Sequence, residues 1–186
     1  MRRSFDRLPD AAYDHVHGVI SLYLIRHAIA EPRGRDWPDD TKRPLTDRGM
    51  ARFREAVGGL AAAGVELDVV LTSPLVRARQ TAELLSRGLA ATPPVEVTDA
   101  LLPGEPPARV AEALGKHGRL SSIALVGHEP GLGELGAWLI GAREPLPFKK
   151  GGVCRIDVAT LPPVPPGQML WLATPRMLRG MGSGTR

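Results

Sequence analysis

The stretch VISLYLIRHA, residues 19–28, is a mostly apolar run that is interrupted near its end by an arginine and a histidine. A short and nearly continuous apolar run is typical of a strand that is buried on both faces of a sheet. The run therefore predicts a buried strand over 19–25, with Arg26 and His27 directly after its carboxyl end. Arg26 is a permanent cation and His27 titrates near neutral pH, so the pair marks a candidate site.

Strand-like and helix-like segments alternate along the rest of the chain. Three further apolar runs predict strands at 67–73, 95–98 and 122–128. Apolar residues at helical spacing predict helices at 46–64, 74–89, 107–116 and 131–141. The late segments GVCRIDVATL and GQMLWLAT are close enough in sequence to pair as an antiparallel hairpin. Together these segments predict an α/β protein, a three-layer α/β/α sandwich whose mainly parallel sheet has an antiparallel edge.

Length and composition indicate one folded domain. The chain has 186 residues, of which 43% are hydrophobic and 24% charged, and it contains no internal repeat. We expect residues 1–18 to be a lead-in, 19–178 the domain and 179–186 a flexible tail. The single cysteine, Cys154, excludes an internal disulfide, and no apolar run is long enough to span a membrane. We therefore expect a cytoplasmic protein.

The net charge of +4 raises the question of a nucleic-acid partner. Nucleic-acid binders usually gather Lys and Arg on one face and interleave them with aromatic residues. Here the arginines are scattered among acids, and aromatic residues make up only 4% of the chain. The composition argues against nucleic-acid binding, and a few arginines around a bound anion account for the surplus charge equally well.

Polar residues follow three of the predicted strands. Arg26 and His27 follow the first strand, and TSPLVRARQTAE (72–83) brings Arg77 after the second. In VGHEPG (126–131), His128 and Glu129 stand at the end of a third strand. In open α/β sheets, ligands bind beyond the carboxyl ends of the strands. We therefore expect these side chains to meet at one edge of the sheet.

These residue types suit phosphoryl transfer. Arginine forks match phosphate oxygens, and a neutral imidazole has a lone pair that can attack phosphorus. The same cations disfavour protonation of the imidazole and stabilise charge on the transferring group. The set predicts a reaction through a covalent phosphohistidine, with no metal and no cofactor.

Four blocks carry a resemblance to a known family: LIRHA (24–28), PLTDRG (44–49), TSPLVRARQTAE (72–83) and LVGHEPGLGEL (125–135). Together they resemble the histidine phosphatase superfamily, with its phosphoglycerate mutase-like fold, over about residues 20–175. The short chain, RHA in place of RHG, and the segment KKGGVCRIDV (149–158) are most similar to SixA-type phosphohistidine phosphatases. The resemblance implies that His27 is the nucleophile, that Arg26 and Arg77 bind the phosphoryl group, and that His128 completes the pocket.

The general acid is the least defined part of the expected site. Relatives that act on alkyl phosphates place a carboxylate near the departing oxygen. Glu105, in the loop LLPGEPP (101–107), lies about where the family carries such an acid, with Asp99, Glu31 and Glu129 as other candidates. The alternative is that Glu105 is a solvated loop carboxylate and that Glu129 only orients its loop.

The expected activity is hydrolysis of phosphohistidine. A protonated imidazole leaves phosphorus easily without a dedicated acid, and the stretches 29–45 and 99–106 are too short for the capping subdomain of longer relatives. An open site admits a side chain on a phosphorylated protein, and Lys149 and Lys150 either steer an acidic partner or are only surface lysines. The alternatives are a phosphatase for a small phosphorylated metabolite or nucleotide, and a non-catalytic phosphate-binding module. A mutase fits less well because it needs a lid against water.

Overall fold

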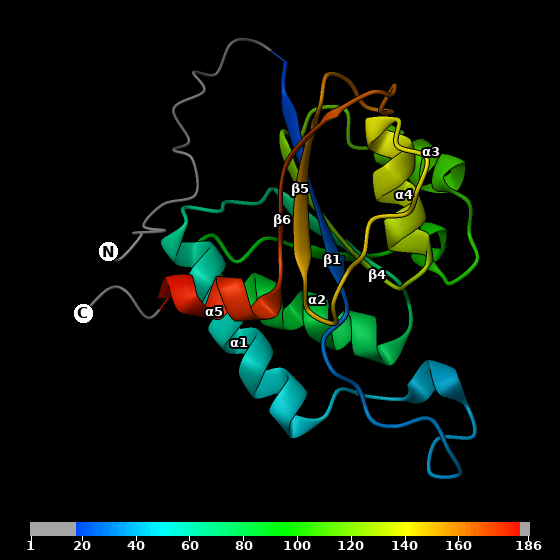
Figure 1. The fold of residues 1–186 in the computed structure, drawn as a ribbon, viewed down its shortest axis with the longest axis vertical. Coiled ribbons are helices and arrows are strands. Elements are labelled where there is room, and N and C mark those ends of the chain that lie inside the picture. Colours follow the sequence, from blue (N-terminus) through cyan, green and yellow to red (C-terminus); the bar gives the residue numbers. More distant parts are fainter. Residues whose placement is uncertain (1–17, 183–186) are drawn as a thin grey trace.

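Six strands form one mixed sheet in the order β3-β2-β4-β1-β5-β6 (Figure 1). The computed structural model describes residues 18–182. The strands are β1 (Ile20–Arg26), β2 (Val69–Thr72), β3 (Val95–Val97), β4 (Ser122–Gly127), β5 (Val153–Val158) and β6 (Gln168–Ala173). The strands β1 to β4 pair in parallel, whereas β5 is antiparallel to both β1 and β6. The predicted parallel sheet with an antiparallel hairpin is confirmed.

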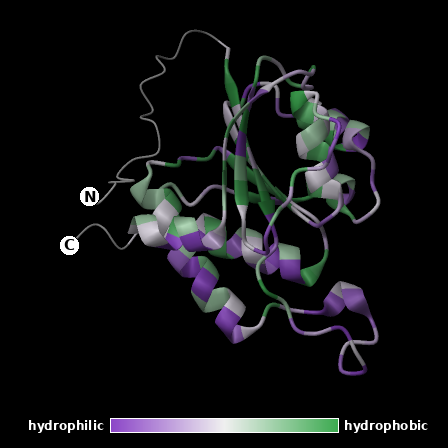
Figure 2. Ribbon diagram, viewed as in Figure 1, coloured by the Kyte–Doolittle hydropathy of each residue, from purple (hydrophilic) through white to green (hydrophobic). Residues whose placement is uncertain are grey.

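Helices cover both faces of the sheet (Figure 1). One face carries α1 (Asp47–Ala62), α2 (Val76–Gly88) and α5 (Pro175–Gly182), and the other carries α3 (Pro107–Gly115) and α4 (Gly131–Ile140). Side chains of β1 point alternately to the two faces, so Tyr23 and Ile25 join the first core while Leu22 and Leu24 join the second. The predicted α/β/α sandwich is confirmed, and apolar residues concentrate in its central strands (Figure 2).

The segments between the main elements include two short 3-10 helices that the sequence did not predict. They are η1 (Asp40–Lys42), between β1 and α1, and η2 (Asp99–Leu101), between β3 and α3. The segment that carries η1 lies beyond the carboxyl end of β1 in Figure 1. Apart from an isolated bridge between Ala30 and Leu45, it is held by side chains rather than by a strand ladder.

The carboxyl-terminal helix differs from the prediction. We expected a tail from residue 179, but α5 continues to Gly182. Leu178 is fully buried against α1, and a Cβ on Gly59 of α1 would overlap the carbonyl oxygen of Leu178. The absence of a side chain at Gly59 therefore allows α5 to pack closely on α1. The predictions for residues 1–17 and 183–186 lie outside the described residues.

The beginning of α1 is fixed to the segment that follows β1. Thr46 caps the helix, since its hydroxyl accepts a hydrogen bond from the Gly49 N–H at 2.9 Å. The Thr46 N–H donates to the Ile29 carbonyl at 3.0 Å, and a Cβ on Gly49 would overlap that same carbonyl oxygen. The chain just after His27 is thereby packed on the first turn of α1. Within residues 18–182, no helix combines the length and the apolar character that crossing a membrane requires.

Candidate active site

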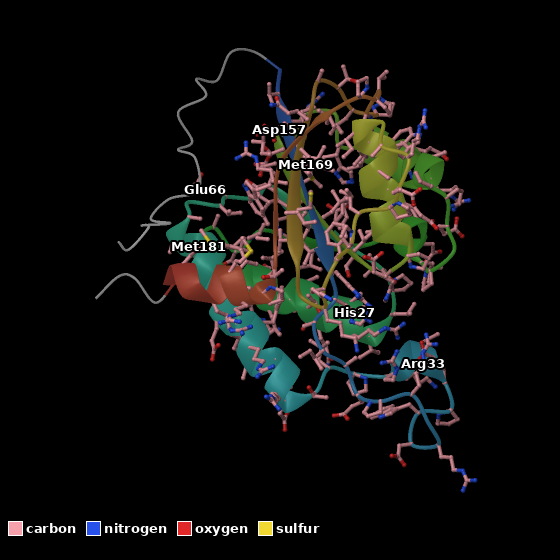
Figure 3. All side chains as sticks on the ribbon, in the orientation of Figure 1. His27, Arg33, Glu66, Asp157, Met169 and Met181 are labelled. Carbon is pink, nitrogen blue, oxygen red and sulfur yellow. The ribbon has the colours of Figure 1, made fainter. Side chains whose placement is uncertain are left out.

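His27 and His128 lie side by side because the strands that precede them are in register. Strands β1 and β4 run in parallel with Arg26 opposite Gly127, so the next residue of each strand leaves the sheet at the same edge. The ring centroids of the two histidines are 5.1 Å apart, at an angle of 55°. Each side chain is only 6% exposed. Figure 3 shows His27 at the carboxyl end of β1.

The His27 ring is arranged as a neutral nucleophile. Its Nδ1 lies 2.7 Å from the Ala28 carbonyl, so Nδ1 carries the proton and donates it there, which leaves the lone pair on Nε2. Burial, and then the charges of Arg77, Arg26 and Lys150, lower the pKa of His27 to about 4, although the hydrogen bond to Ala28 acts in the other direction. At neutral pH the ring is therefore uncharged.

This protonation state can be measured directly. We expect the ring nitrogens of His27 to report a neutral imidazole down to about pH 5 and to titrate near the pKa of about 4 that burial and the neighbouring cations impose. Nitrogen NMR of the ring, assigned by comparison with the His27→Gln variant, follows the titration. A midpoint near the ordinary value of 6.5 would contradict this description of the site.

His128 is held by the end of β2. Its Nε2 lies 3.0 Å from the Ser73 hydroxyl oxygen, which also accepts from the Leu75 N–H at 3.4 Å. The Ser73 hydroxyl thus has its proton available for Nε2, which leaves the proton of a neutral His128 on Nδ1. Burial, and then the charges of His27 and Arg77, lower the pKa of His128 to about 3. Its Nδ1 is a buried donor without a partner among residues 18–182.

Arg77 lies in the first turn of α2 and is fixed by Asp40 of η1. Its Nη1 donates to the Asp40 carbonyl at 2.8 Å, and its Nη2 lies 3.1 Å from the Asp40 carboxylate. The side chain is only 2% exposed. A hydrogen bond from Arg43 and the charges of Arg77, Arg43 and Arg33 hold the pKa of Asp40 below its ordinary value. The carboxylate therefore remains charged and orients the guanidinium, whose Nε is buried without a partner in the described chain.

Arg26 is held by the loop that precedes β5. Its Nη1 donates to the Phe148 carbonyl at 2.7 Å, and the Phe148 N–H donates to a carboxylate oxygen of Glu129 at 2.8 Å. The second oxygen of Glu129 accepts from the Gly133 N–H at 3.2 Å. Both oxygens of Glu129 are thus occupied by backbone groups, which matches the alternative that Glu129 orients its loop. The Nε of Arg26 is also a buried donor without a partner in the described part of the chain.

Asp40, Arg43 and Ser73 contribute to the site and were not predicted. Arg43 is only 7% exposed, and it donates to the Asp40 carboxylate and to the Glu31 carbonyl, at 2.8 Å each. Its positive charge also contributes to the lowered pKa of His128. Arg43 directly precedes the PLTDRG block, and that position is the one sequence signal that could have identified it.

Three buried nitrogen donors therefore share one feature: none has a hydrogen-bond partner among residues 18–182. They are Nε of Arg26, Nε of Arg77 and Nδ1 of His128. Buried polar groups in folded proteins are nearly always paired, so donors left in this way point to a ligand rich in acceptors. A tetrahedral oxyanion beside the neutral His27 ring fits them. In the same residues no group of three or more His, Cys, Asp and Glu is placed to hold a metal ion.

Glu105 is placed differently from the other predicted residues. Its carboxylate lies 3.7 Å from Nε of Arg109, one turn further along, and about a third of the side chain is exposed. Among the described residues, no hydrogen bond or ion pair connects Glu105 with His27 or His128. These contacts favour the alternative in which Glu105 is a loop carboxylate.

Comparison with known proteins gives consistent matches. The model of the histidine phosphatase superfamily (branch 1) matches residues 22–102. An uncharacterized protein of Picosynechococcus sp. strain PCC 7002 is 39% identical over 121 residues, which are 62% of this chain and 70% of that protein. Phosphohistidine phosphatase SixA of Escherichia coli K12 is 29% identical over 142 residues, covering 75% of this chain and 86% of SixA. The structure of the protein histidine phosphatase SixA complexed with tungstate has a TM-score of 0.75 and 26% identity, covering 84% of this chain and 98% of that one.

Proposed function

Because the chain belongs to the histidine phosphatase superfamily, as a phosphatase of the SixA type, we propose that it hydrolyses phosphohistidine through a covalent intermediate on His27. The observation that carries this proposal is the set of buried, unpaired donors next to a neutral His27 ring. The similar SixA structure is a complex with tungstate, a tetrahedral oxyanion, and this supports the proposal that the present chain binds a phosphoryl group.

The reaction proceeds in two displacements. The Nε2 lone pair of His27 attacks phosphorus, an N–P bond forms, and the bond from phosphorus to the leaving imidazole nitrogen of the substrate breaks. Water then attacks the phosphoryl group on His27, which releases inorganic phosphate and returns the ring to its neutral form. Arg26, Arg77 and His128 donate to the phosphoryl oxygens in both steps, and Arg43 adds a further positive charge nearby.

The leaving group separates phosphohistidine from ordinary phosphate esters. An imidazole nitrogen that has gained a proton leaves as a neutral ring, whereas an alkoxide leaves slowly unless a side chain protonates it. Glu105 pairs with Arg109 and Glu129 pairs with backbone N–H groups, so neither carboxylate is poised as that acid. The short 29–45 segment carries only one 3-10 helix, which is consistent with a site that receives a histidine presented by another protein.

A comparison of substrates tests this preference. We expect kcat/KM for a phosphohistidine peptide to exceed that for an alkyl phosphate by about 100-fold or more, because neither Glu105 nor Glu129 is placed to protonate the departing alkoxide. Release of inorganic phosphate is the measurement, and Glu105→Gln should change neither rate by more than about twofold. If alkyl phosphates or nucleotides are preferred, and Glu105→Gln lowers their turnover about 100-fold, Glu105 is the acid and the enzyme is a metabolite phosphatase.

A further inference from the structure

A basic pocket lies next to the candidate active site. It has a volume of about 250 Å³ and lies among the first turns of α1, the beginning of α5 and the loop before β5. Its lining includes five cationic side chains and no Asp or Glu: Arg52, Lys149, Lys150, Arg176 and Arg179. None of these cations is among the buried unpaired donors of the phosphoryl site, and only Lys150 acts on that site, through its charge on His27.

The pocket is continuous with the backbone of the nucleophile. Ala28, the residue after His27, forms part of its wall together with Ile29. The Gly151 N–H donates to the carbonyls of Arg26 and His27, at 3.0 and 3.1 Å, so the loop that carries the lysines is attached to the nucleophile's own strand end. Gly151 adopts a φ of +77°, which favours glycine at this turn. The charge of Lys150 also contributes to the lowered pKa of His27.

The electrostatics of the pocket favour an anionic occupant. Thr174, Pro175 and Arg176 line it at the N-terminus of α5, the positive end of the helix dipole. Arg179 is paired at its Nε with Glu55, at 3.4 Å, but Glu55 does not line the pocket. Lys149, Lys150 and Arg176 are exposed, so their ammonium and guanidinium groups are accessible to a partner. Several cations in one hollow repel one another until an anion lies between them.

We propose that this pocket binds acidic side chains that flank the phosphohistidine on a partner protein, an inference that rests on the proposed phosphohistidine phosphatase activity. A carboxylate is small enough to enter a pocket of about 250 Å³ while the rest of its protein stays outside. Since the pocket begins one residue after His27, a carboxylate near the phosphohistidine reaches it while the phosphoryl group occupies the catalytic donors. The pocket therefore selects the substrate by charge and speeds its association.

Two synthetic peptides serve as probes. Each contains a single histidine phosphorylated with phosphoramidate, flanked on both sides by Glu in one peptide and by Gln in the other. We expect the Glu peptide to be hydrolysed with a kcat/KM about tenfold higher at about 0.01 M ionic strength, and this preference to shrink at about 0.15 M, where charges are screened within about 8 Å. The difference should lie mainly in KM.

Matched charge reversals distinguish the effect of the pocket on hydrolysis from the effect of the protein's net charge. Arg52→Glu combined with Arg176→Glu changes two pocket residues, whereas Arg54→Glu combined with Arg119→Glu changes two exposed arginines outside it by the same amount. We expect the pocket variant to lose the preference for the Glu peptide and to hydrolyse the Gln peptide within about twofold of the parent. The control variant should keep the preference, and thermal unfolding of both variants establishes that they are folded.

The outcomes distinguish this inference from the activity on which it rests. Equal rates for the two peptides in the parent, or an equal loss with both peptides in the pocket variant, would overturn the pocket's role and leave the phosphatase activity standing. If neither peptide is hydrolysed while an aryl phosphate is, the proposed function fails and the inference fails with it. In that case, the affinities of a sugar bisphosphate and a sugar monophosphate are compared in the parent and in the pocket variant. If only the bisphosphate binds more weakly to the pocket variant, the occupant of the pocket is a second phosphate group.

Discussion

Replacing His27 with alanine should lower kcat/KM by at least about 10⁴-fold for every phosphorylated substrate, because losing a nucleophile removes the whole covalent route. Brief exposure of the parent protein to labelled substrate should trap label on His27 that is labile in acid and stable in base, as an N–P bond requires. His117→Ala is the matched control, since His117 pairs with Glu96 away from the candidate site.

Three results would contradict the role of His27. Hydrolysis of an aryl phosphate that survives His27→Ala would place the nucleophile elsewhere. A parent protein that binds an oxyanion but never turns over any phosphorylated substrate would be a phosphate-binding module instead. A trapped label that is stable in acid would exclude a phosphohistidine, even if the activity itself were lost.

Replacing Arg77 with alanine should lower kcat by about 10²–10³-fold, the usual loss when a donor to developing charge is removed. Arg77→Lys should restore little, because a lysine ammonium lacks the planar fork that remains paired with Asp40 while presenting Nε to a ligand. Arg79→Ala is the control, since Arg79 lies two residues further along α2 and is exposed. Steady-state kinetics with one aryl phosphate compares the three variants.

Asp40→Asn tests how Arg77 is positioned. This change removes the ion pair to Arg77 but keeps the backbone carbonyl that accepts from its Nη1. We expect a loss of about tenfold, smaller than for Arg77→Ala, and partial rescue by Asp40→Glu, which restores the charge. An equal loss in Asp40→Asn and Asp40→Glu would indicate that residue 40 acts only through the fold of η1.

The sequence was sufficient to predict the strands that carry the candidate site. The apolar run before Arg26 and the similar run before His128 each signal a buried strand with a polar end, and the rule for parallel sheets brings those ends to one edge. The register between β1 and β4 cannot be predicted from either apolar run alone, yet it brings the two histidine rings into contact. Only the structure shows this register.

The residues that the sequence did not reveal act through long-range contacts. Asp40 lies in a polar loop whose composition is that of an ordinary surface loop. Its ion pair with Arg77 is apparent only once η1 is folded against α2. Helix α5 was missed for a similar reason, because its glycines resemble a flexible end until Leu178 is seen against Gly59. A local sequence pattern cannot report a contact whose partner lies 37 residues away, as Arg77 does from Asp40, or still further away, as Gly59 does from Leu178.

The pairing of β1 with β4 in the middle of the sheet also fixes the backbone at the two histidines. The backbone at neither histidine can shift without disturbing the parallel pairing that ends at Arg26 and Gly127, and the His27 N–H adds a hydrogen bond to the Gly127 carbonyl at 3.0 Å. Residues 32–36, by contrast, are exposed and lie outside every helix and strand. The fixed geometry belongs to the strand ends that carry the two histidines, and this exposed loop does not share it.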